Sequence, residues 1–303
     1  MEPLQITFLG TGCAAPTVER ALSSIAIQYR GHNLLFDCPE GVQRQLLFAK
    51  LSYMRIPAIF ISHFHADHVL GLPGLLATMS MHERDHPLTI FGPKGVKERV
   101  KKALELSVMR VAFEVKTQEL KNGIVWKGDS YTVKAFPLKH SSPCFGFSFE
   151  EKGKEGEFQR NKATELGVPE GPLWAQLQQG KSVKAGSKTV KPEQVMDYSK
   201  ARKGRKVSIV FDTWPNKSYY GAIRDSDWLA HEASFSAQLE DRAKETLHST
   251  AKAAGTTARE TNAKQLVLFH ISNRYSDAGA LELEAAQEFG NVVLAKDLMK
   301  FQL

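Results

Sequence analysis

The chain has 303 residues, of which 42% are hydrophobic and 24% charged, and its formal net charge is +7. This composition suits a globular protein with a sizeable core, and the lack of an apolar run of about 18 residues excludes a membrane-spanning helix. The N-terminal residues also lack the basic-then-apolar pattern of a secretory signal. The three cysteines are widely spaced without a C-x-x-C pair, so we expect no disulfide framework, no membrane partner and a cytoplasmic location.

Short apolar stretches alternate with turn residues over the first 150 residues and again after residue 206. Alternating apolar and polar residues indicate half-buried strands, and apolar residues three or four positions apart indicate helices. The order of these elements predicts an α/β fold in which sheets pack between helices. The predicted strands are 5–9, 24–29, 33–38, 57–61, 88–91, 113–115, 132–137, 145–149, 207–211, 228–230, 265–269 and 292–294, and the predicted helices are 42–51, 72–81, 96–106, 249–262 and 278–289.

Residues 151–206 interrupt this alternation. They include 13 Lys or Arg and seven Asp or Glu, a net of +6, together with seven glycines and three prolines. An insertion of this kind is either a functional projection or a disordered, solvated excursion. Because most of the positive charge of the chain lies here, nucleic acid is a candidate partner for this segment.

A cluster of metal-binding residue types follows the predicted strand 57–61. His63, His65, Asp67 and His68 lie within six positions of one another. Residues two apart at the end of a strand can point the same way, so His63 and His65 can bind one ion, while Asp67 and His68 can face a second. Imidazole and carboxylate together are ligands for zinc, manganese or iron. A chance cluster is the alternative, but burying these groups without partners would be costly.

Three further residues of the same types also follow predicted strands. His140 follows the strand 132–137, Asp212 follows 207–211, and His270 follows 265–269. Taken singly, each would more often be a structural or surface residue. Taken together with the first cluster, they form a set of five histidines and two aspartates that predicts a site for two metal ions.

Segments along nearly the whole chain match one known family. They are FLGTGCAAPT, LLFDCPEGVQRQLL, ISHFHADHVLGLPGLL, LKHSSPCFGF, GVPEGPLWAQLQQGKSV, IVFDTWP, AHEASF, LHST and LFHISNRY. The histidine motif resembles the metallo-β-lactamase superfamily, and the other segments resemble its ribonuclease Z family of tRNA 3′-processing endoribonucleases. The resemblance implies a four-layer αβ/βα sandwich over residues 1–303, with residues 151–206 as an inserted flexible arm that binds tRNA.

The resemblance also implies a role for each metal-binding residue. His63, His65 and His140 would bind one metal ion, Asp67, His68 and His270 would bind the other, and Asp212 would bridge the two. The expected cofactor is two zinc ions per subunit, with manganese or iron as alternatives. Paired ions would make hydroxide available near neutral pH for in-line attack on phosphorus.

Catalytic and substrate-binding residues follow from the same resemblance. His248 is the candidate proton donor to the leaving ribose 3′-oxygen, with Glu232 as its orienting partner, and Asp67 would both bind metal and hold the attacking water. A helix-terminal residue beside the cap Ser249 is the alternative role for His248. The residues expected to contact substrate are Gly171, Pro172 and Lys181 in the arm, together with Arg20 and Arg274.

The expected function is removal of the 3′ trailer from precursor tRNA by a homodimer, leaving a 3′-hydroxyl on the tRNA. One alternative is a phosphodiesterase of the same fold that acts on small phosphodiesters such as cyclic nucleotides. The other is a non-catalytic, metal-stabilised RNA-binding protein. The basic arm speaks against the first alternative, and the intact set of His248, Glu232 and metal ligands speaks against the second.

The sequence departs from the family pattern at four places. The family loop P-x-K-x-R-N is here residues 16–21, PTVERA, without the lysine and the asparagine. Since this loop is associated with the 3′ end of tRNA, the cleavage position and the response to a 3′ CCA are open. Phe211 replaces a glycine before Asp212, Pro39 replaces a glycine in the segment DCPEG, and Ser234 replaces a threonine. None of these changes removes a metal ligand.

Overall fold

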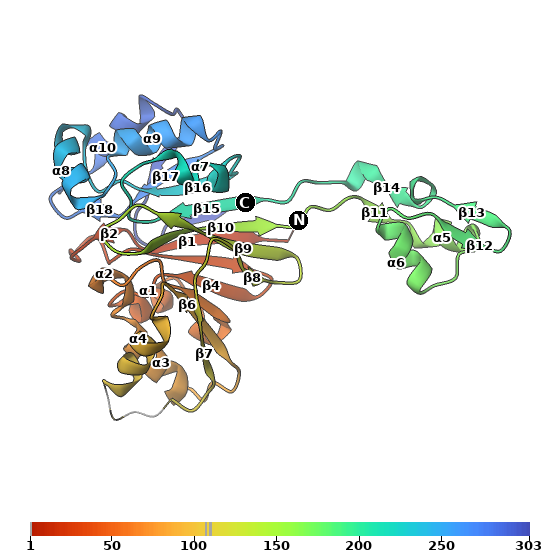
Figure 1. Ribbon diagram of the computed structural model, residues 1–303, viewed down its shortest axis with the longest axis horizontal. Helices are drawn as coiled ribbons and strands as arrows, with labels where there is room; N and C mark the ends of the chain where they lie inside the picture. Colours follow the sequence, from red (N-terminus) through yellow and green to blue (C-terminus); the bar gives the residue numbers. More distant parts are fainter. Residues whose placement is uncertain (1, 107, 109–110) are drawn as a thin grey trace. The chain divides into compact units, whose positions relative to one another are not determined.

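The computed structural model describes residues 2–106, 108 and 111–303. Its contacts divide the chain into two compact units. The larger, which we call the body, comprises Met1–Phe149 and Lys206–Leu303, and the smaller, which we call the arm, comprises Glu150–Arg205 (Figure 1). The bounds of the arm nearly coincide with the basic segment 151–206.

The body contains two seven-stranded sheets. The first sheet has the strand order β20-β1-β3-β4-β5-β6-β7 and the second the order β19-β17-β16-β15-β10-β9-β8. Strands of the first are β1 Leu4–Gly10, β3 Ser24–Tyr29, β4 His32–Phe36, β5 Ala58–Phe60, β6 Leu88–Gly92, β7 Val115–Glu119 and β20 Lys300–Gln302. Strands of the second are β8 Gly123–Lys127, β9 Tyr131–Leu138, β10 Cys144–Glu151, β15 Lys206–Val210, β16 Trp228–Glu232, β17 Leu266–Phe269 and β19 Val292–Leu294.

Helices cover the outer side of each sheet (Figure 1). The first sheet is covered by α1 Val42–Phe48, α3 Leu72–Met81 and α4 Val96–Glu105, and the second by α7 Tyr220–Ile223, α9 Ala251–Glu260 and α10 Gly279–Ala286. The short helices α2 Ala66–Val69 and α8 Glu240–Thr246 complete the body. The resulting order of helices, sheet, sheet and helices is a four-layer α/β sandwich, which confirms the predicted fold class. No helix in the described part of the chain is both long and apolar enough to cross a membrane.

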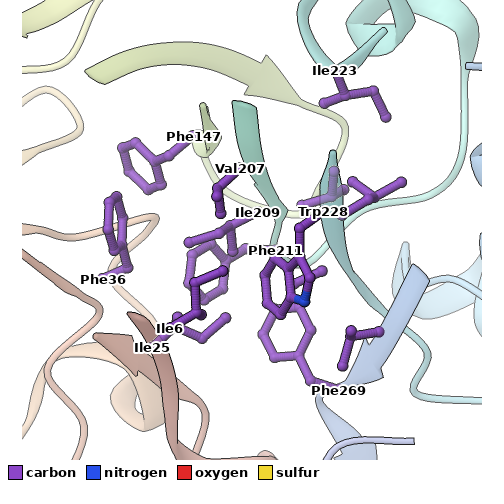
Figure 2. Close-up of a cluster of buried hydrophobic side chains, with 14 of the residues drawn as sticks. Ile6, Ile25, Phe36, Phe147, Val207, Ile209, Phe211, Ile223, Trp228 and Phe269 are labelled. Carbon is purple, nitrogen blue, oxygen red and sulfur yellow. The ribbon is translucent and has the colours of Figure 1, made fainter. Parts of the chain in front are cut away.

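Aromatic and branched side chains fill the space between the two sheets. Rings from both sheets meet there, with centroids 5.7 Å apart for Phe8 and Trp228 and 5.4 Å apart for Phe36 and Phe147 (Figure 2). A second core lies between the first sheet and its helices, where Leu46 and Leu75 are fully buried. These two cores hold the sheets rigidly, so the ends of their strands have fixed positions.

Some elements of the body differ from the sequence prediction. Strand β7 begins at Val115 and continues to Glu119, beyond the predicted 113–115. Strands β8 and β20 and helices α7 and α8 were not predicted. β20 alternates polar Lys300 and Gln302 with Phe301 and gains its hydrogen bonds only by pairing with β1, which a local sequence pattern does not reveal.

The arm has regular structure and a core of its own. Its elements are helices α5 Arg160–Glu165 and α6 Pro172–Gln178 and the strand pairs β11 Glu157–Phe158 with β14 Met196–Asp197 and β12 Val183–Ala185 with β13 Lys188–Val190. The fully or nearly fully buried apolar residues of this core are Ala163, Val168, Leu177, Val183, Val190 and Val195. The segment is therefore a small folded unit, in contrast to the disordered excursion that the composition left open.

Candidate metal centre

Parallel strands bring the predicted ligands together. In the first sheet, β4, β5 and β6 are parallel, and in the second sheet β15, β16, β17 and β19 are parallel. Asp37 follows β4, His63 follows β5, Asp212 follows β15 and His270 follows β17. Because the carboxyl ends of parallel strands meet at one edge of a sheet, side chains placed there converge on a shared site.

The turn that carries Asp67 and His68 packs tightly against the segment after β4. Helix α2 begins directly after His65, so Asp67 and His68 lie in its single turn. The backbone N–H of Cys38 donates to the carbonyl of His68 at 2.9 Å, and that of Gly71 donates to the carbonyl of Cys38 at 2.9 Å. A Cβ atom at Gly71 would lie 1.9 Å from the carbonyl oxygen of Pro39, so only glycine permits this approach.

The first group of potential ligands consists of His63, His65, His140 and Asp212, whose ligand atoms all lie within 4.8 Å of one another. Nδ1 of His65 lies 3.0 Å from Nε2 of His63 and 3.3 Å from Nε2 of His140. Oδ2 of Asp212 lies 3.6 Å from Nε2 of His63. Ligand atoms that surround one zinc ion at about 2 Å are separated by similar distances of roughly 3–4 Å.

The second group consists of Asp67, His68 and His270. Oδ2 of Asp67 lies 3.4 Å from Nε2 of His68 and 3.8 Å from Nε2 of His270. Asp212 also reaches this group, because its Oδ2 is 3.6 Å from Nε2 of His68 and its Oδ1 is 3.3 Å from Nε2 of His270. One carboxylate thus lies between the two groups.

Three buried ligand atoms have no hydrogen-bond partner in the described part of the protein. They are Nε2 of His68, Oδ1 of Asp212 and Nε2 of His270. Buried polar atoms are normally paired, and all three of these point into the same cluster. The residues therefore fit a divalent cation, and their nitrogen and oxygen donors suit zinc, manganese or iron.

Groups behind the cluster hold three of its imidazoles. The carboxylate of Asp37 lies 2.6 Å from Nδ1 of His68, and the hydroxyl of Ser234 lies 2.9 Å from Nδ1 of His270. Nδ1 of His140 lies 3.0 Å from the carbonyl oxygen of Leu247 and donates to it. Each contact occupies Nδ1 and leaves Nε2 directed at the cluster, which is how metal-binding histidines are usually oriented.

The charges of the cluster shift its pKa values strongly. Burial opposes a charge on His68, but the carboxylates of Asp212 and Asp37 outweigh it and raise its pKa well above the usual value. Burial likewise opposes ionisation of Asp212, but the neighbouring His270 and His68 hold its pKa well below the usual range. Burial and the charge of His68 lower the pKa of His63. Such a concentration of opposed charges in the interior is typical of a functional site.

His248 lies at the rim of the cluster and is held by Glu232. Nδ1 of His248 is 3.1 Å from Oε1 of Glu232 and 3.9 Å from Oδ2 of Asp212. Burial opposes a charge on His248, but the carboxylates of Glu232 and Asp212 outweigh it and raise its pKa to about 9. The imidazole is therefore charged at neutral pH and can release a proton.

Glu232 is itself fixed from several sides. Its carboxylate accepts hydrogen bonds from the backbone N–H groups of Thr213, Ser249 and Ser234 at 3.0, 2.9 and 3.1 Å. The hydroxyl of Ser234 also donates to it at 2.9 Å. Such a fully buried carboxylate has few alternative positions, so the position of His248 is fixed as well.

The residues predicted to contact substrate lie in both units. In the body, the guanidinium of Arg274 stacks 4.7 Å from the ring centre of Phe235, whereas that of Arg20 turns inward and donates to Thr11 Oγ1 and the Ala295 carbonyl. The three arm residues are exposed around helix α6, where Gly171 and Pro172 begin the helix and Lys181 follows it.

Asp37 and Ser234 contribute to the centre although the sequence did not assign them a role. Asp37 also accepts hydrogen bonds from the backbone N–H and the hydroxyl of Ser62 at 2.6 and 2.7 Å. A signal for Asp37 was present, since it follows a strand as the predicted ligands do. Ser234 had no such signal, because its role depends on β16 and β17 being neighbours.

The substitution of Phe211 for the usual glycine is accommodated in the core. Its ring is fully buried, and its centroid lies 5.5 Å from that of Phe269 and 6.2 Å from that of Phe147. The ring therefore fills space between the sheets behind Asp212, and it does not crowd the ligand groups. Pro39 accepts a hydrogen bond from the N–H of Val42 at 3.2 Å, at the start of α1.

The fold and the divided ligand cluster define a metallo-β-lactamase-fold protein. The metallo-β-lactamase-fold protein YhfI from Bacillus subtilis is 19% identical, with a TM-score of 0.73 over 100% of both chains. Human tRNase Z, short form, is 30% identical, with a TM-score of 0.72 over 98% of each chain.

Sequence relatives narrow this class to one family. Ribonuclease Z of Methanosarcina acetivorans is 42% identical over 99% of this chain and 98% of its own, and ribonuclease Z of Methanosarcina mazei is 44% identical over the same shares. The chain therefore belongs to the ribonuclease Z family. A family model described as anti-Pycsar protein Apyc1 also matches residues 4–158.

Proposed function

We propose that the protein is a metal-dependent endoribonuclease that removes the 3′ trailer from precursor tRNA. The observation that carries this proposal is the pair of ligand groups joined at Asp212, with the Glu232-held His248 at its rim. Membership of the ribonuclease Z family supports the choice of precursor tRNA as substrate. The free cysteines suit a cytoplasmic location.

We propose two zinc ions per subunit as the cofactor, with manganese or iron as alternatives. His63, His65 and His140 would hold one ion, Asp67, His68 and His270 the other, and Asp212 both. Bound together, the ions would supply hydroxide near neutral pH and neutralise charge on the phosphate oxygens.

The residues of the chain would divide the remaining work. Asp67 accepts a hydrogen bond from the N–H of Ala14 at 2.9 Å, which fixes the carboxylate that would hold the attacking water. Attack on phosphorus breaks the bond to the ribose 3′-oxygen, and that oxygen takes a proton from His248. Glu232 then stabilises the orientation of His248, and the tRNA product ends in a 3′-hydroxyl.

We propose that the arm binds the body of the tRNA. Its lysines at positions 181, 184, 188, 191 and 200 are all exposed, and they surround a small folded core that keeps them together. Cations on a surface of this kind contact phosphates irrespective of base sequence. Such contacts suit an RNA duplex, whose bases lie in a deep groove that side chains cannot read.

We also propose a homodimer. Leu47 and Phe48 of α1, Leu70, and Met81 of α3 are large apolar residues that are more than half exposed, and α1 packs against α3. A second copy that meets the same surface through a two-fold axis would cover them. Gel filtration with light scattering is expected to give the mass of two chains, and the mass of one chain would contradict the dimer.

The test of the function is cleavage of a 3′-extended precursor tRNA, with and without a 3′ CCA, by purified protein supplied with zinc or manganese. We expect a cut near the base of the acceptor stem, and we expect His65→Ala to lose it. Mapping the product ends to the nucleotide also shows how the 16–21 loop, which lacks the family lysine and asparagine, responds to CCA.

The alternatives make different predictions in the same assay. A phosphodiesterase for small substrates would hydrolyse bis(p-nitrophenyl) phosphate and leave the precursor intact. A non-catalytic RNA-binding protein would bind the precursor and cleave neither substrate. Either result would replace the proposed function.

A further inference from the structure

A loop of the body, residues 14–21, links the metal centre to a carboxylate near the end of the chain. At its first residue, the N–H of Ala14 donates to Oδ2 of Asp67 at 2.9 Å. At its last residue, the N–H of Ala21 donates to Oδ2 of Asp297 at 2.6 Å. The two ends of the loop are thus tied to two carboxylates, of which only Asp67 belongs to the ligand groups.

Asp297 is the centre of a hydrogen-bond network around this loop. Its Oδ1 accepts from the hydroxyl of Thr11 at 2.7 Å, and its Oδ2 also accepts from Nε2 of Gln45 at 3.2 Å. Burial raises the pKa of the Asp297 carboxyl, whereas the bonds from Thr11 and Ala21 and the charge of Arg20 lower it. A half-buried carboxylate with donors from three separate segments is well placed to fix their relative positions.

The arginine of the loop takes part in the same network. Nη1 of Arg20 donates to the hydroxyl of Thr11 at 2.6 Å and to the carbonyl of Ala295 at 2.9 Å. The Thr11 hydroxyl therefore accepts from Arg20 and donates to Asp297. Because its guanidinium is used in this way, Arg20 stabilises the loop from within, and the loop offers no other cation to a phosphate.

Both supports of the loop are rigid. The N–H of Leu298 donates to the carbonyl of Phe8 at 2.7 Å, which fixes the residue after Asp297 on strand β1. On the other side, a Cβ atom at Gly10 would lie 2.0 Å from the carbonyl oxygen of Leu22, so the return of the loop packs directly on a glycine. Between these supports, residues 16–19 are exposed.

We propose that Asp297 is a positioning residue that holds the 14–21 loop beside the metal centre and thereby sets which phosphodiester of the precursor is cut. This inference rests on the proposed function. With a valine and an alanine where the family has lysine and asparagine, the exposed part of the loop can position the RNA only by its shape and backbone. The anchoring of that backbone then determines the precision of cleavage.

The test compares Asp297→Ala with wild type on precursor tRNA and on bis(p-nitrophenyl) phosphate. We expect kcat/KM for the precursor to fall about 10- to 100-fold and the cuts to spread to neighbouring nucleotides, since displacement of about 1 Å has effects of this size. Hydrolysis of the small phosphodiester should stay within about twofold, because it does not need the loop. Thr11→Val should act in the same direction, more weakly, because it removes the hydroxyl between Arg20 and Asp297.

Asp227→Ala is the matched control. Asp227 also holds two segments together, by accepting from the N–H of Lys206 at 2.8 Å and from Nζ of Lys264 at 2.6 Å, but neither belongs to the loop. It should leave the cut positions unchanged. A single cut at the wild-type position with unchanged kinetics in folded Asp297→Ala would overturn the proposal, and so would an equal loss of both activities.

Hydrogen exchange separates this proposal from the proposed function. Backbone amides in residues 14–21 should exchange faster in Asp297→Ala than in wild type, whereas those of β5 should not. If wild type leaves precursor tRNA intact, the proposed function fails, and exchange still decides whether Asp297 anchors the loop. Unchanged exchange in the loop would refute the anchor.

Discussion

The body and the arm differ in the size of their cores and in the use of their charged residues. In the body, two extended cores hold the strand ends rigidly, and buried carboxylates and imidazoles face one another at those ends. In the arm, a core of six small or medium-sized apolar residues supports exposed lysines. The comparison indicates that precise chemistry requires the larger core, whereas binding of a polyanion requires only that cations be held near one another.

Asp212→Ala should have the largest effect, because it removes the carboxylate that lies between both ligand groups. We expect metal content to fall and both precursor cleavage and hydrolysis of a small phosphodiester to drop by at least about 10³-fold. Metal analysis by mass spectrometry and the two assays measure this. Full metal content in the variant would show that Asp212 does not bridge the groups.

Removal of the arm should separate the two units functionally. The pair Lys154 and Arg202 exchanges two backbone hydrogen bonds, of 2.9 and 2.7 Å, so an Asn-Gly turn in place of residues 155–201 can close the hairpin there. We expect this variant to lose precursor cleavage and to keep hydrolysis of the small phosphodiester. Loss of both activities in a folded variant would contradict the role assigned to the arm.

His248→Ala tests the division of work within the body. We expect precursor cleavage to fall about 10²- to 10⁴-fold, as for loss of a general acid, with metal content unchanged. Bis(p-nitrophenyl) phosphate has a leaving group that needs little protonation, so its hydrolysis should fall much less. Equal losses on both substrates would favour a structural role for His248 beside the helix cap.

Glu151→Gln should have the smallest effect, confined to the arm. Glu151 is buried and accepts bidentate pairs from Arg202, at 2.9 and 2.9 Å, and from Arg205, at 2.8 and 3.0 Å. Loss of the charge leaves two arginines without a full partner and should weaken the base of the arm by about 3 kcal/mol. We expect faster hydrogen exchange in the arm and a higher KM for precursor, with kcat little changed.

An exposed ion pair provides the control for this variant. Arg242 and Glu245 lie 2.9 Å apart at the surface of the body, with both side chains more than half exposed. Since exposed pairs contribute little, Glu245→Gln should change neither exchange nor KM. Unchanged exchange in the arm of Glu151→Gln would show that the arm does not depend on these pairs.

The sequence by itself determined the fold class and the residue types of the metal centre. Hydrophobic periodicity revealed most strands and helices, because one face of each element is buried against a core. His63, Asp212 and His270 could be selected because each follows an apolar strand, and strand ends in α/β folds converge. The motifs along the chain were specific enough to indicate the ribonuclease Z family, which the relatives confirm.

Only the tertiary structure decided which residues support that centre. Asp37 meets His68, Ser234 meets His270, and Asp297 meets Thr11 from 286 positions away. It also turned Arg20 inward, although the sequence had suggested a contact with substrate. These contacts depend on strand order and on the closing of β20 onto β1, and local patterns carry no record of such long-range pairings.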